Sequence, residues 1–479
     1  MISRTEALTE LLEGWLPQQR WFPAKGRDTR LVPVSVTPCD LGQGLHGEFR
    51  LFRLASGGAV EPVVLQVPLL FSPHTGGTDP AGPLHAGFIG TIPGDMAGEE
   101  WDVFDGPKRR EFVEAVLSLM AGDGILRTGR GSGVVGRTAA GGRTFLETLT
   151  RPLSLESIRG EQSNSSVIAN PGPGGTILKF FRTLFPGRNP EVELGEALTR
   201  LGTQDVPSTV GWLQAEWGED RGTVRTDLAV THEFLPGGRD AWAAAVLSAA
   251  EGSSFARQAH AIGQGTARIH RRLAEGLPAA SAGDAQGVLD RLAERIRESW
   301  AQARAVVGPY DVQIERLLAS LTTVPTHPQR IHGDLHLGQI LSVDSPAGAG
   351  DRWIFLDFEG EPLRPAVERS LPDLPLRDVV GLLRSFDYAA GAAHRQAPDA
   401  VVPGGWVADC SEAFLEGYSS VVPGRIDQRS PLFMALWLDK ALYEVRYEQN
   451  NRPEWLEIPA LAARSALEEL SGPEVKGNP

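Results

Sequence analysis

Two stretches of the sequence, 331–341 and 353–360, constrain the fold more than any other part of the chain. The first reads Ile-His-Gly-Asp-Leu-His-Leu-Gly-Gln-Ile-Leu and places Asp334 five residues before Gln339, with glycines nearby and apolar residues after them. This pattern predicts a tight loop that leads back into a strand. The second reads Trp-Ile-Phe-Leu-Asp-Phe-Glu-Gly and is typical of a buried strand that delivers Asp357 to a cleft.

These side chains suit the transfer of a phosphoryl group, which needs a group to orient the acceptor hydroxyl and ligands for Mg²⁺ on the phosphates. Asp334 can take the first role, and Gln339 and Asp357 offer the oxygen ligands that Mg²⁺ prefers. Glu359 follows two residues later and, on an extended chain, would point to the same side as a further metal or acceptor contact. Each stretch alone is also compatible with an ordinary turn or strand edge. Together and in this order they resemble the catalytic loop and the Asp-Phe-Gly element of protein kinases.

The composition narrows the class of protein. The 479 residues carry a net charge of −14, with a pI near 5.3, which argues against nucleic acid or an anionic membrane as the main partner. No run of 18 apolar residues occurs, and the first residues lead into an amphipathic segment, so we expect no membrane span and no signal peptide. Cys39 and Cys410 lie far apart without metal-site spacing, which favours a reduced, cytoplasmic context.

The N-terminal half of the chain is rich in strand patterns, and the C-terminal half shows helical periods. Alternation predicts strands at 31–36, 48–54 and 60–69, with more short strands between 127 and 150 around a turn at Gly141-Gly142, and a helical period covers 102–120. Helices are predicted at 242–247, 253–273, 284–307, 312–321, 376–392, 406–418, 431–450 and 456–470. We therefore expect three parts, namely a strand-rich cap over 1–100, an intermediate subdomain completing an N-terminal lobe over 101–237, and a helical C-terminal lobe over 238–479.

A hairpin in the intermediate part carries Lys179 among apolar residues. Asn189 and Pro190 then predict the start of a helix, with Glu193 near its positive end. A strand lysine followed by a helix glutamate fits the lysine–glutamate ion pair of a kinase N-terminal lobe. The alternative is that Lys179 lies on an edge strand with its amine in water.

Two further segments are candidate nucleotide contacts. The sequence lacks a GxGxxG loop, so residues 161–166, including Ser163, Asn164 and Ser165, would have to cover the phosphates with hydroxyls, amides and backbone N–H groups. Backbone groups from Glu233 to Leu235, where a strand ends in a turn, could meet an adenine edge, although a plain strand end fits as well.

At these residues the sequence resembles the actinobacterial maltokinases of the aminoglycoside phosphotransferase-like superfamily. The resemblance runs in order from residue 18 to about 460 and rests on the motifs QRWFPAKGR, GEQSNSSVI, ILKFFR, NPEVEL, HGDLHLGQIL, IFLDFEGEP, PLRDVVGLLRSFDYAA, LDKALYEVRYE and NRPEWLEIP. It implies an α+β, bilobal fold like that of eukaryotic protein kinases, with an N-terminal cap subdomain and a helical C-terminal lobe. The implied activity is transfer of the γ-phosphoryl of ATP, with Mg²⁺, to the anomeric hydroxyl of maltose, giving maltose 1-phosphate for glycogen and α-glucan synthesis.

The resemblance also implies the partners. ATP and maltose would be the small-molecule partners, and a trehalose synthase is a candidate protein partner because some members are fused to one. We expect a cytoplasmic monomer that binds neither nucleic acid nor membrane.

A helix over 434–447 is the candidate acceptor surface. Its polar face carries Asp439, Lys440, Tyr443 and Tyr447, opposite an apolar stripe. A solvated surface would explain such a face, but tyrosines among charged groups also suit a sugar.

Other residues have two interpretations each. Arg377 and Asp378 fit a sugar contact or a structural salt bridge, His336 fits a substrate contact, and His332 is expected to brace the catalytic loop.

One position departs from the family. Trp437 stands where a glutamate commonly precedes Leu-Asp-Lys, and its ring would narrow or restack the acceptor pocket. A related branch phosphorylates glucosamine and lacks the Asp-Lys pair, so Asp439-Lys440 favours maltose. A kinase for glucosamine or an aminoglycoside, or an inactive scaffold in an α-glucan enzyme complex, remain the alternatives.

Overall fold

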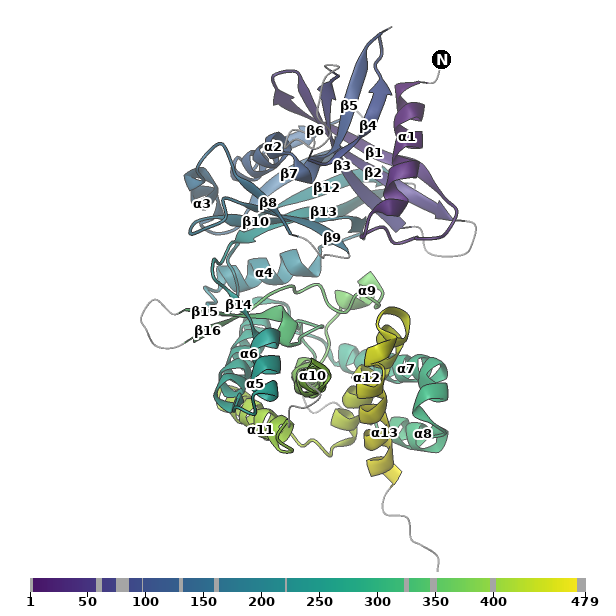
Figure 1. Cartoon of the computed structure of the whole chain (residues 1–479), viewed down its shortest axis with the longest axis vertical. Coiled ribbons are helices and arrows are strands. Elements are labelled where there is room, and N and C mark those ends of the chain that lie inside the picture. Colours follow the sequence, from purple (N-terminus) through teal and green to yellow (C-terminus); the bar gives the residue numbers. More distant parts are fainter. Residues whose placement is uncertain are drawn as a thin grey trace, which may run out of the picture. The chain divides into compact units, whose positions relative to one another are not determined.

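The computed structural model shows a mixed helix-and-sheet protein that divides into two compact units (Figure 1). The first unit comprises Met1–Arg200 and Pro207–Pro236, and the second comprises Leu201–Val206 and Gly237–Pro479. The separate division of the first 237 residues at residue 100 stays a prediction. The structure describes residues 3–56, 63–74, 86–96, 98–128, 132–158, 163–219, 222–322, 327–344, 351–396 and 402–471.

A six-stranded antiparallel sheet contains the N-terminal strands of the first unit. Its order is β1-β2-β3-β5-β4, and β11 pairs with β3. Helix α1 (Arg4–Trp15) begins with a capping box between Ser3 and Glu6 and buries Leu8 and Leu12. The strands are β1 (Thr29–Gly42), β2 (Leu45–Ser56), β3 (Val63–Pro73), β4 (Phe88–Pro93), β5 (Glu100–Asp105) and β11 (Thr183–Leu184).

A seven-stranded sheet forms the rest of the first unit, in the order β6-β7-β12-β13-β10-β9-β8. Helices α2 (Arg110–Ala121), α3 (Gly142–Thr148) and α4 (Pro190–Arg200) accompany it. The strands are β6 (Ile125–Arg127), β7 (Gly133–Thr138), β8 (Leu155–Ser157), β9 (Asn164–Ala169), β10 (Thr176–Phe181), β12 (Thr209–Glu219) and β13 (Gly222–Glu233).

Two local predictions in this unit are wrong. The segment 102–120 is not one helix, because its first residues complete β5, which pairs with β3 and β4, and the helix starts at Arg110. Gly141-Gly142 opens α3 instead of joining two strands. A Cβ on Gly142 would lie 1.9 Å from the carbonyl oxygen of Val210, so this close approach of α3 to β12 requires glycine.

The second unit is mostly helical. Figure 1 shows α10 (Pro375–Gln396) end-on, with α5, α6 and α11 on one side and α7, α8, α12 and α13 on the other. A short sheet of β14 (Arg239–Asp240), β15 (Ile340–Asp344) and β16 (Asp351–Phe355) lies beside them. The other helices are α5 (Ala241–Ala250), α6 (Ala256–Gly276), α7 (Ala282–Val307), α8 (Asp311–Ala319), α9 (Ala366–Arg369), α11 (Trp406–Ser419), α12 (Pro431–Asn451) and α13 (Glu457–Ser471). Among the described residues, no helix combines the length and apolar character needed to cross a membrane.

Buried polar contacts join the two sheets of the first unit. The Arg182 guanidinium donates to Asp105 Oδ1 at 2.6 Å and to Ser165 Oγ at 2.8 Å, and it lies over the Trp21 ring. The Gln66 amide donates to the carbonyl oxygens of Phe181 and Leu228. Arg182 is 0% exposed, so its charge depends on Asp105 for compensation.

We expect Asp105→Asn to destabilise the first unit by about 3–5 kcal/mol, because it leaves a buried guanidinium without its carboxylate. Urea unfolding followed by tryptophan fluorescence measures the change. The control is Glu100→Gln, an exposed position on the same strand, which should stay within about 0.5 kcal/mol of the natural protein. Equal stability of the two variants would show that the Arg182–Asp105 pair does not hold the sheets together.

Candidate active site

The first unit holds a buried lysine–glutamate pair. Lys179 on β10 lies 2.8 Å from Glu191 Oε2, and His232 Nε2 contacts the other oxygen of Glu191 at 3.2 Å. Asn189 Oδ1 accepts from the N–H of Glu191 at 2.8 Å, as the predicted helix start requires. The assignment of Glu193 to this pair is wrong. Glu193 lies two residues, or about 200°, further round α4.

Glu191 stays ionised in this pair. Burial alone would raise the pKa of Glu191, but the charges of Lys179 and His232 outweigh it and hold that pKa well below its usual range. The Lys179 amine is therefore held on β10 beside an ionised carboxylate.

The hairpin that carries Lys179 also orients the predicted phosphate-binding residues. Lys179 pairs with Ser166, so Asn164, two residues away on β9, faces the same side of the sheet. Ser165 faces the other side, and its hydroxyl accepts from Arg182, so the predicted role of that hydroxyl is wrong. Asn164 Nδ2 donates to Ser163 Oγ at 3.1 Å, and these two residues remain candidates. Residues 161 and 162 lie outside the described residues.

The predicted adenine contact lies where β13 ends. The N–H of Glu233 donates to the Ser208 carbonyl, and the N–H of Phe234 donates to the Gly175 carbonyl, both at 2.9 Å. The backbone beyond Glu233 leaves the sheet here, and Leu235 is half-buried. The contact of Glu233 and Leu235 with a base stays a prediction.

In the second unit, Asp378 braces the loop that carries Asp334. Asp378, in the first turn of α10, accepts from the N–H groups of His332 and Gly333, both at 2.9 Å. It also contacts His270 Nε2 at 3.0 Å and is almost fully buried. The predicted substrate contact is therefore wrong for Asp378, because its oxygens are committed to the loop.

His332 supports the same loop, as expected. Its Nε2 lies 2.7 Å from the Leu356 carbonyl oxygen and must donate to it, and its Nδ1 accepts from the N–H of Asp334. Its ring also packs on Phe358. The loop is thus tied to the segment that follows β16.

Two of the three predicted metal ligands, Gln339 and Asp357, lie side by side. Gln339 Nε2 donates to Asp357 Oδ2 at 3.1 Å. Asp357 adopts a left-handed backbone conformation with a φ of 62°, an unfavourable state of the kind found at functional sites. The Asp357 carboxylate and the Gln339 amide fit Mg²⁺ at this separation once the amide group rotates and presents its oxygen in place of its nitrogen. The chain is not extended here, because β16 ends at Phe355 and Asp357 turns the chain. Carboxylate oxygens of Asp357 and Glu359 nevertheless lie within 4.8 Å of each other, so Glu359 remains a candidate metal ligand.

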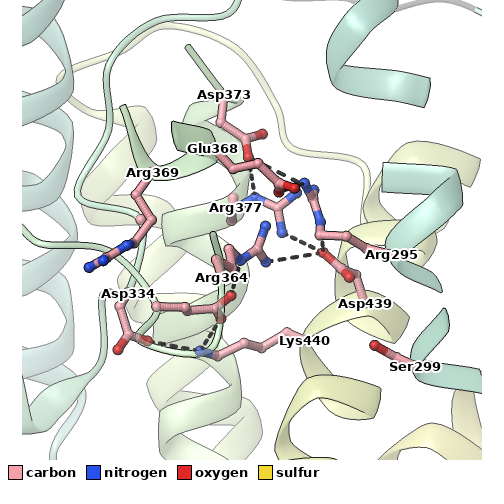
Figure 2. Close-up of polar contacts among 12 residues, drawn as sticks. Arg295, Ser299, Asp334, Arg364, Glu368, Arg369, Asp373, Arg377, Asp439 and Lys440 are labelled. Carbon is pink, nitrogen blue, oxygen red and sulfur yellow. Dashed lines mark hydrogen bonds and ion pairs between the residues drawn. The ribbon is translucent and has the colours of Figure 1, made fainter. Parts of the chain in front are cut away.

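Asp334 is the end of a chain of alternating charges (Figure 2). Lys440 Nζ donates to Asp334 Oδ1 at 3.1 Å and to Glu361 Oε1 at 2.7 Å. Glu361 also pairs with Arg364, and Arg364 reaches Asp439 at 3.3 Å. Burial alone would raise the pKa of Glu361, but the charges of Arg364 and Lys440 lower it to about 2. Lys440 is therefore held beside Asp334 by a carboxylate that stays ionised.

The inner end of this chain is one carboxylate among three arginines. Asp439 is 2% exposed and accepts from Arg377 at 2.6 Å, Arg364 at 3.3 Å and Arg295 at 3.4 Å. Burial alone would raise the pKa of Asp439, but the arginine charges hold it well below its usual range. The predicted sugar contact is therefore wrong for Asp439. For Arg377 the structure favours the salt-bridge alternative.

A cleft of about 380 Å³ opens beside Asp334. Lys440, Tyr443 and Tyr447 line it, as the helix pattern predicted, and so does His336. The remaining lining residues are Trp242, Gly338, Pro362, Gly381, Ser385, Tyr388, Glu444, Glu448, Arg452 and Trp455.

The sequence analysis missed two glutamates in the cleft and one behind it. Glu444 and Glu448 follow Lys440 at intervals of four residues, so they share its face of α12, and this spacing could have revealed them. Glu361 follows the acidic run at 357–359, but no spacing rule connects it to a lysine on a distant helix.

Each described carboxylate in the cleft has a cationic partner. Asp334 has Lys440, Glu444 accepts from two nitrogens of Arg384 at 2.7 and 3.1 Å, and Glu448 accepts from two nitrogens of Arg452. The cleft therefore presents balanced charge rather than a free negative group.

His336 adds no positive charge to this balance. Its Nδ1 accepts from the N–H of Gly338 at 3.1 Å. Burial, the largest effect, lowers the pKa of its ring, so the imidazole is neutral near pH 7.

Trp437 does not shape the cleft, and the expectation that it would is wrong. Its ring stacks on Phe433 and lies 5.2 Å from the Arg384 guanidinium. It lines a different cavity, between α10, α12 and α13.

The chain is similar to known proteins in sequence and in fold. A glucosamine kinase from Streptacidiphilus jiangxiensis is 29% identical over 354 residues, which are 68% of this chain and 76% of the relative. One from Mycolicibacterium smegmatis is 26% identical over 341 residues, which are 67% of this chain and 80% of that protein. The solved structure of a glucosamine kinase in complex with glucosamine, ADP and inorganic phosphate covers 97% of this chain and 99% of its own, with a TM-score of 0.59 and 24% identity. That likeness shows a shared fold.

Two family descriptions match the sequence itself. Residues 15–108 match the maltokinase N-terminal cap domain. Residues 154–413, more than half of the chain, match the phosphotransferase enzyme family. The chain therefore belongs to the phosphotransferase enzyme family and carries a cap of the maltokinase type in front of it.

Proposed function

We propose that the chain is an ATP-dependent maltokinase, which transfers the γ-phosphoryl of ATP to the anomeric hydroxyl of maltose. Its family makes it a nucleotide-dependent kinase, and the cap domain supports a sugar as the acceptor. The product, maltose 1-phosphate, would feed glycogen and α-glucan synthesis. An association with trehalose synthase stays a prediction.

The proposal of maltose as the acceptor rests mainly on the balanced charge of the cleft. An ammonium group bound there would need a carboxylate to compensate its desolvation. Asp334, Glu444 and Glu448 already pair with Lys440, Arg384 and Arg452. A neutral sugar needs only hydrogen bonds and apolar ring faces, which the tyrosines of α12 offer.

The proposed mechanism gives each residue one task. Asp334 accepts a hydrogen bond from the anomeric hydroxyl, orients it and takes its proton as the new oxygen–phosphorus bond forms and the bond from the γ-phosphorus to the departing ADP oxygen breaks. Lys440 holds the Asp334 carboxylate at 3.1 Å and offers positive charge near the transferred group. Gln339 and Asp357 would hold Mg²⁺, which neutralises charge on the phosphates when bound. Lys179 would bind the phosphates of ATP, and Glu233 and Leu235 its base.

A second candidate is a glucosamine kinase, because curated relatives have that name. The acceptors of the two functions differ in two ways, because glucosamine carries an amine in place of one hydroxyl and lacks the second hexose ring of maltose. An inactive scaffold is less compatible with the chain, since Lys179 and Asp334 are both held in buried charge networks.

The natural protein should phosphorylate maltose at the anomeric position with a kcat/KM at least about tenfold above that for glucosamine, because an unpaired ammonium costs more than 1.4 kcal/mol in this cleft. Incubation with ATP, Mg²⁺ and maltose, glucose, glucosamine or kanamycin, followed by phosphorus NMR of the products, measures this. A preference for glucosamine or kanamycin would overturn the proposed acceptor, and no turnover with any sugar would favour the scaffold.

Asp334→Asn should lower kcat by about 10²–10⁴-fold and leave the Kd for ATP almost unchanged, because the variant loses the proton acceptor and keeps the nucleotide contacts. Steady-state kinetics and calorimetry give the two values. Asp344→Asn, at an exposed position on β15, is the control and should behave as the natural protein. Turnover retained in Asp334→Asn would remove Asp334 from its role.

Glu191→Gln should raise the KM for ATP by roughly 10–100-fold and leave the KM for maltose nearly unchanged, since a charged hydrogen bond to Lys179 is lost. The matched control is Glu196→Gln on the same helix, where the glutamate pairs with Arg188. If both variants had the same KM for ATP, the Lys179–Glu191 pair would have no part in binding the nucleotide.

A further inference from the structure

A second pocket, of about 310 Å³, lies in the second unit between α7, α12 and the segment 363–368. Positions three or four residues apart share one face of a helix, and such positions on both helices line this pocket. They are Arg291, Arg295 and Ser299 on α7, and Asp439, Tyr443 and Arg446 on α12. The volume is that of a small-ligand site, and we call the cavity the arginine pocket.

The inner wall of the arginine pocket carries an excess of positive charge. Four arginines are among the described residues that line it, and none of them is exposed. Of the four carboxylates among the same residues, Glu294 and Glu298 are exposed, so water and salt screen their charge. Glu368 and Asp439 remain, and Asp439 is already surrounded by three guanidinium groups. The unscreened charge in the pocket is therefore positive.

Arg291 and Arg446 use few of their N–H groups within the described part of the chain. Arg446 Nη1 donates to Ser299 Oγ at 3.3 Å, and Arg291 Nη2 donates to the Pro372 carbonyl at 3.1 Å. Neither guanidinium forms an ion pair with a described carboxylate. Because a guanidinium has five N–H donors, both groups can bind a ligand in the pocket and keep these contacts.

Arg295 is incompletely compensated among the three arginines around Asp439 (Figure 2). Its Nη1 lies 3.6 Å from Glu368 Oε2, and its Nη2 is buried without a hydrogen-bond partner among the described residues. Burial, and then the charge of Arg377, lower the pKa of Arg295 to about 10. An anion beside Arg295 would supply hydrogen bonds and negative charge that its present neighbours do not.

We propose that the arginine pocket binds a phosphate group, carried by inorganic phosphate or by a sugar phosphate, and that the bound phosphate regulates the enzyme. Arg291, Arg295 and Arg446 bring guanidinium groups from two helices to one cavity. Guanidinium groups form charged and often bidentate hydrogen bonds with phosphate oxygens, and the Ser299 hydroxyl adds a donor. Phosphate binding here goes beyond the proposed function, since it does not depend on which sugar reacts.

Occupation of the arginine pocket should weaken binding in the acceptor cleft. Tyr443 lines both the pocket and the cleft. A phosphate that takes hydrogen bonds from Arg295 also competes with Asp439, the carboxylate that precedes Lys440 and holds α12 in place. This regulatory effect rests on the proposed function, because it takes the cleft as the acceptor site.

The alternative is that these arginines serve only the buried charge network around Asp439 and that the pocket holds water. The double variant Arg291→Gln with Arg446→Gln separates the two, because it removes two charges from the pocket and leaves the three arginines around Asp439 in place. The matched control is Arg297→Gln, at an exposed position of α7 that pairs with Glu315 and does not line the pocket. Urea unfolding checks that each variant is folded.

The test measures the Kd of inorganic phosphate and of glucose 1-phosphate by calorimetry. The protein is first saturated with Mg²⁺ and a non-hydrolysable ATP analogue, so that phosphate does not enter the nucleotide site. Arg446→Gln alone should weaken phosphate binding by roughly 10–100-fold, the double variant by more than about 100-fold, and Arg297→Gln should bind as the natural protein does. Inorganic phosphate should also raise the KM for maltose by about fivefold or more in the natural protein, and leave it unchanged in the double variant.

Each outcome decides a different point. No phosphate binding by the natural protein, or the same Kd in the natural protein and the double variant, would overturn the site, and so would an equal loss in Arg297→Gln. Phosphate binding that leaves the KM for maltose unchanged would overturn the regulatory role. Tighter binding of glucose 1-phosphate than of inorganic phosphate would identify a sugar phosphate as the ligand, and the reverse would identify the free ion. Failure to phosphorylate maltose would overturn the proposed function and leave the phosphate site in place, because the calorimetry needs no turnover.

Discussion

One buried carboxylate, Asp439, fixes the position of α12 in the second unit. Asp439 collects guanidinium groups from α7, α10 and the segment before α9, and it sits on α12 beside Lys440. Burying one ion costs several kcal/mol even after relaxation, so such a group is tolerated only where its partners are in place. Any shift of α12 along its axis would separate Asp439 from three charges at once. The register of α12, and with it the face that lines the cleft, is set by this interaction.

The same physical constraint operates in the first unit. Arg182 with Asp105 fixes how the six-stranded sheet meets the seven-stranded sheet, and Glu191 with Lys179 fixes where the lysine amine lies. Buried ion pairs are weak evidence for stability, because well-packed apolar groups often do as well. Here each pair instead places a charged or hydrogen-bonding group at one position. We take positional specificity to be their role in this protein.

The sequence predicts the features that neighbouring residues encode, and it does not predict those that depend on distant segments. Glycines and apolar runs around Asp334 and Asp357 encode a loop and a strand locally. The longer helices of the second unit follow from their 3.6-residue period, so these elements were predicted, whereas the one-turn helix α9 was not. The start of α4 at Pro190 was predicted, but the choice between Glu191 and Glu193 depends on which face of the helix turns toward Lys179. The two glutamates lie about 200° apart round the helix, and local sequence does not give that rotation. The predicted sugar contact of Asp439 was wrong for a different reason. A polar stripe on a helix looks the same whether it faces water, a sugar or three arginines, and those arginines come from distant segments.

Acceptor choice illustrates why family and fold do not decide function. Relatives at 26–29% identity are named glucosamine kinases, and this chain shares their fold. An amine differs from a hydroxyl by one charge, so a binding site discriminates between them through carboxylates that are free to meet that charge. In this cleft every described carboxylate is paired, and the buried pairs are Glu444 with Arg384 and Asp334 with Lys440. Breaking a buried pair costs about 3–5 kcal/mol, more than one ammonium contact of about 1.5–3 kcal/mol returns. The pairing of charges within the cleft, rather than the identity of the fold, therefore favours a neutral sugar.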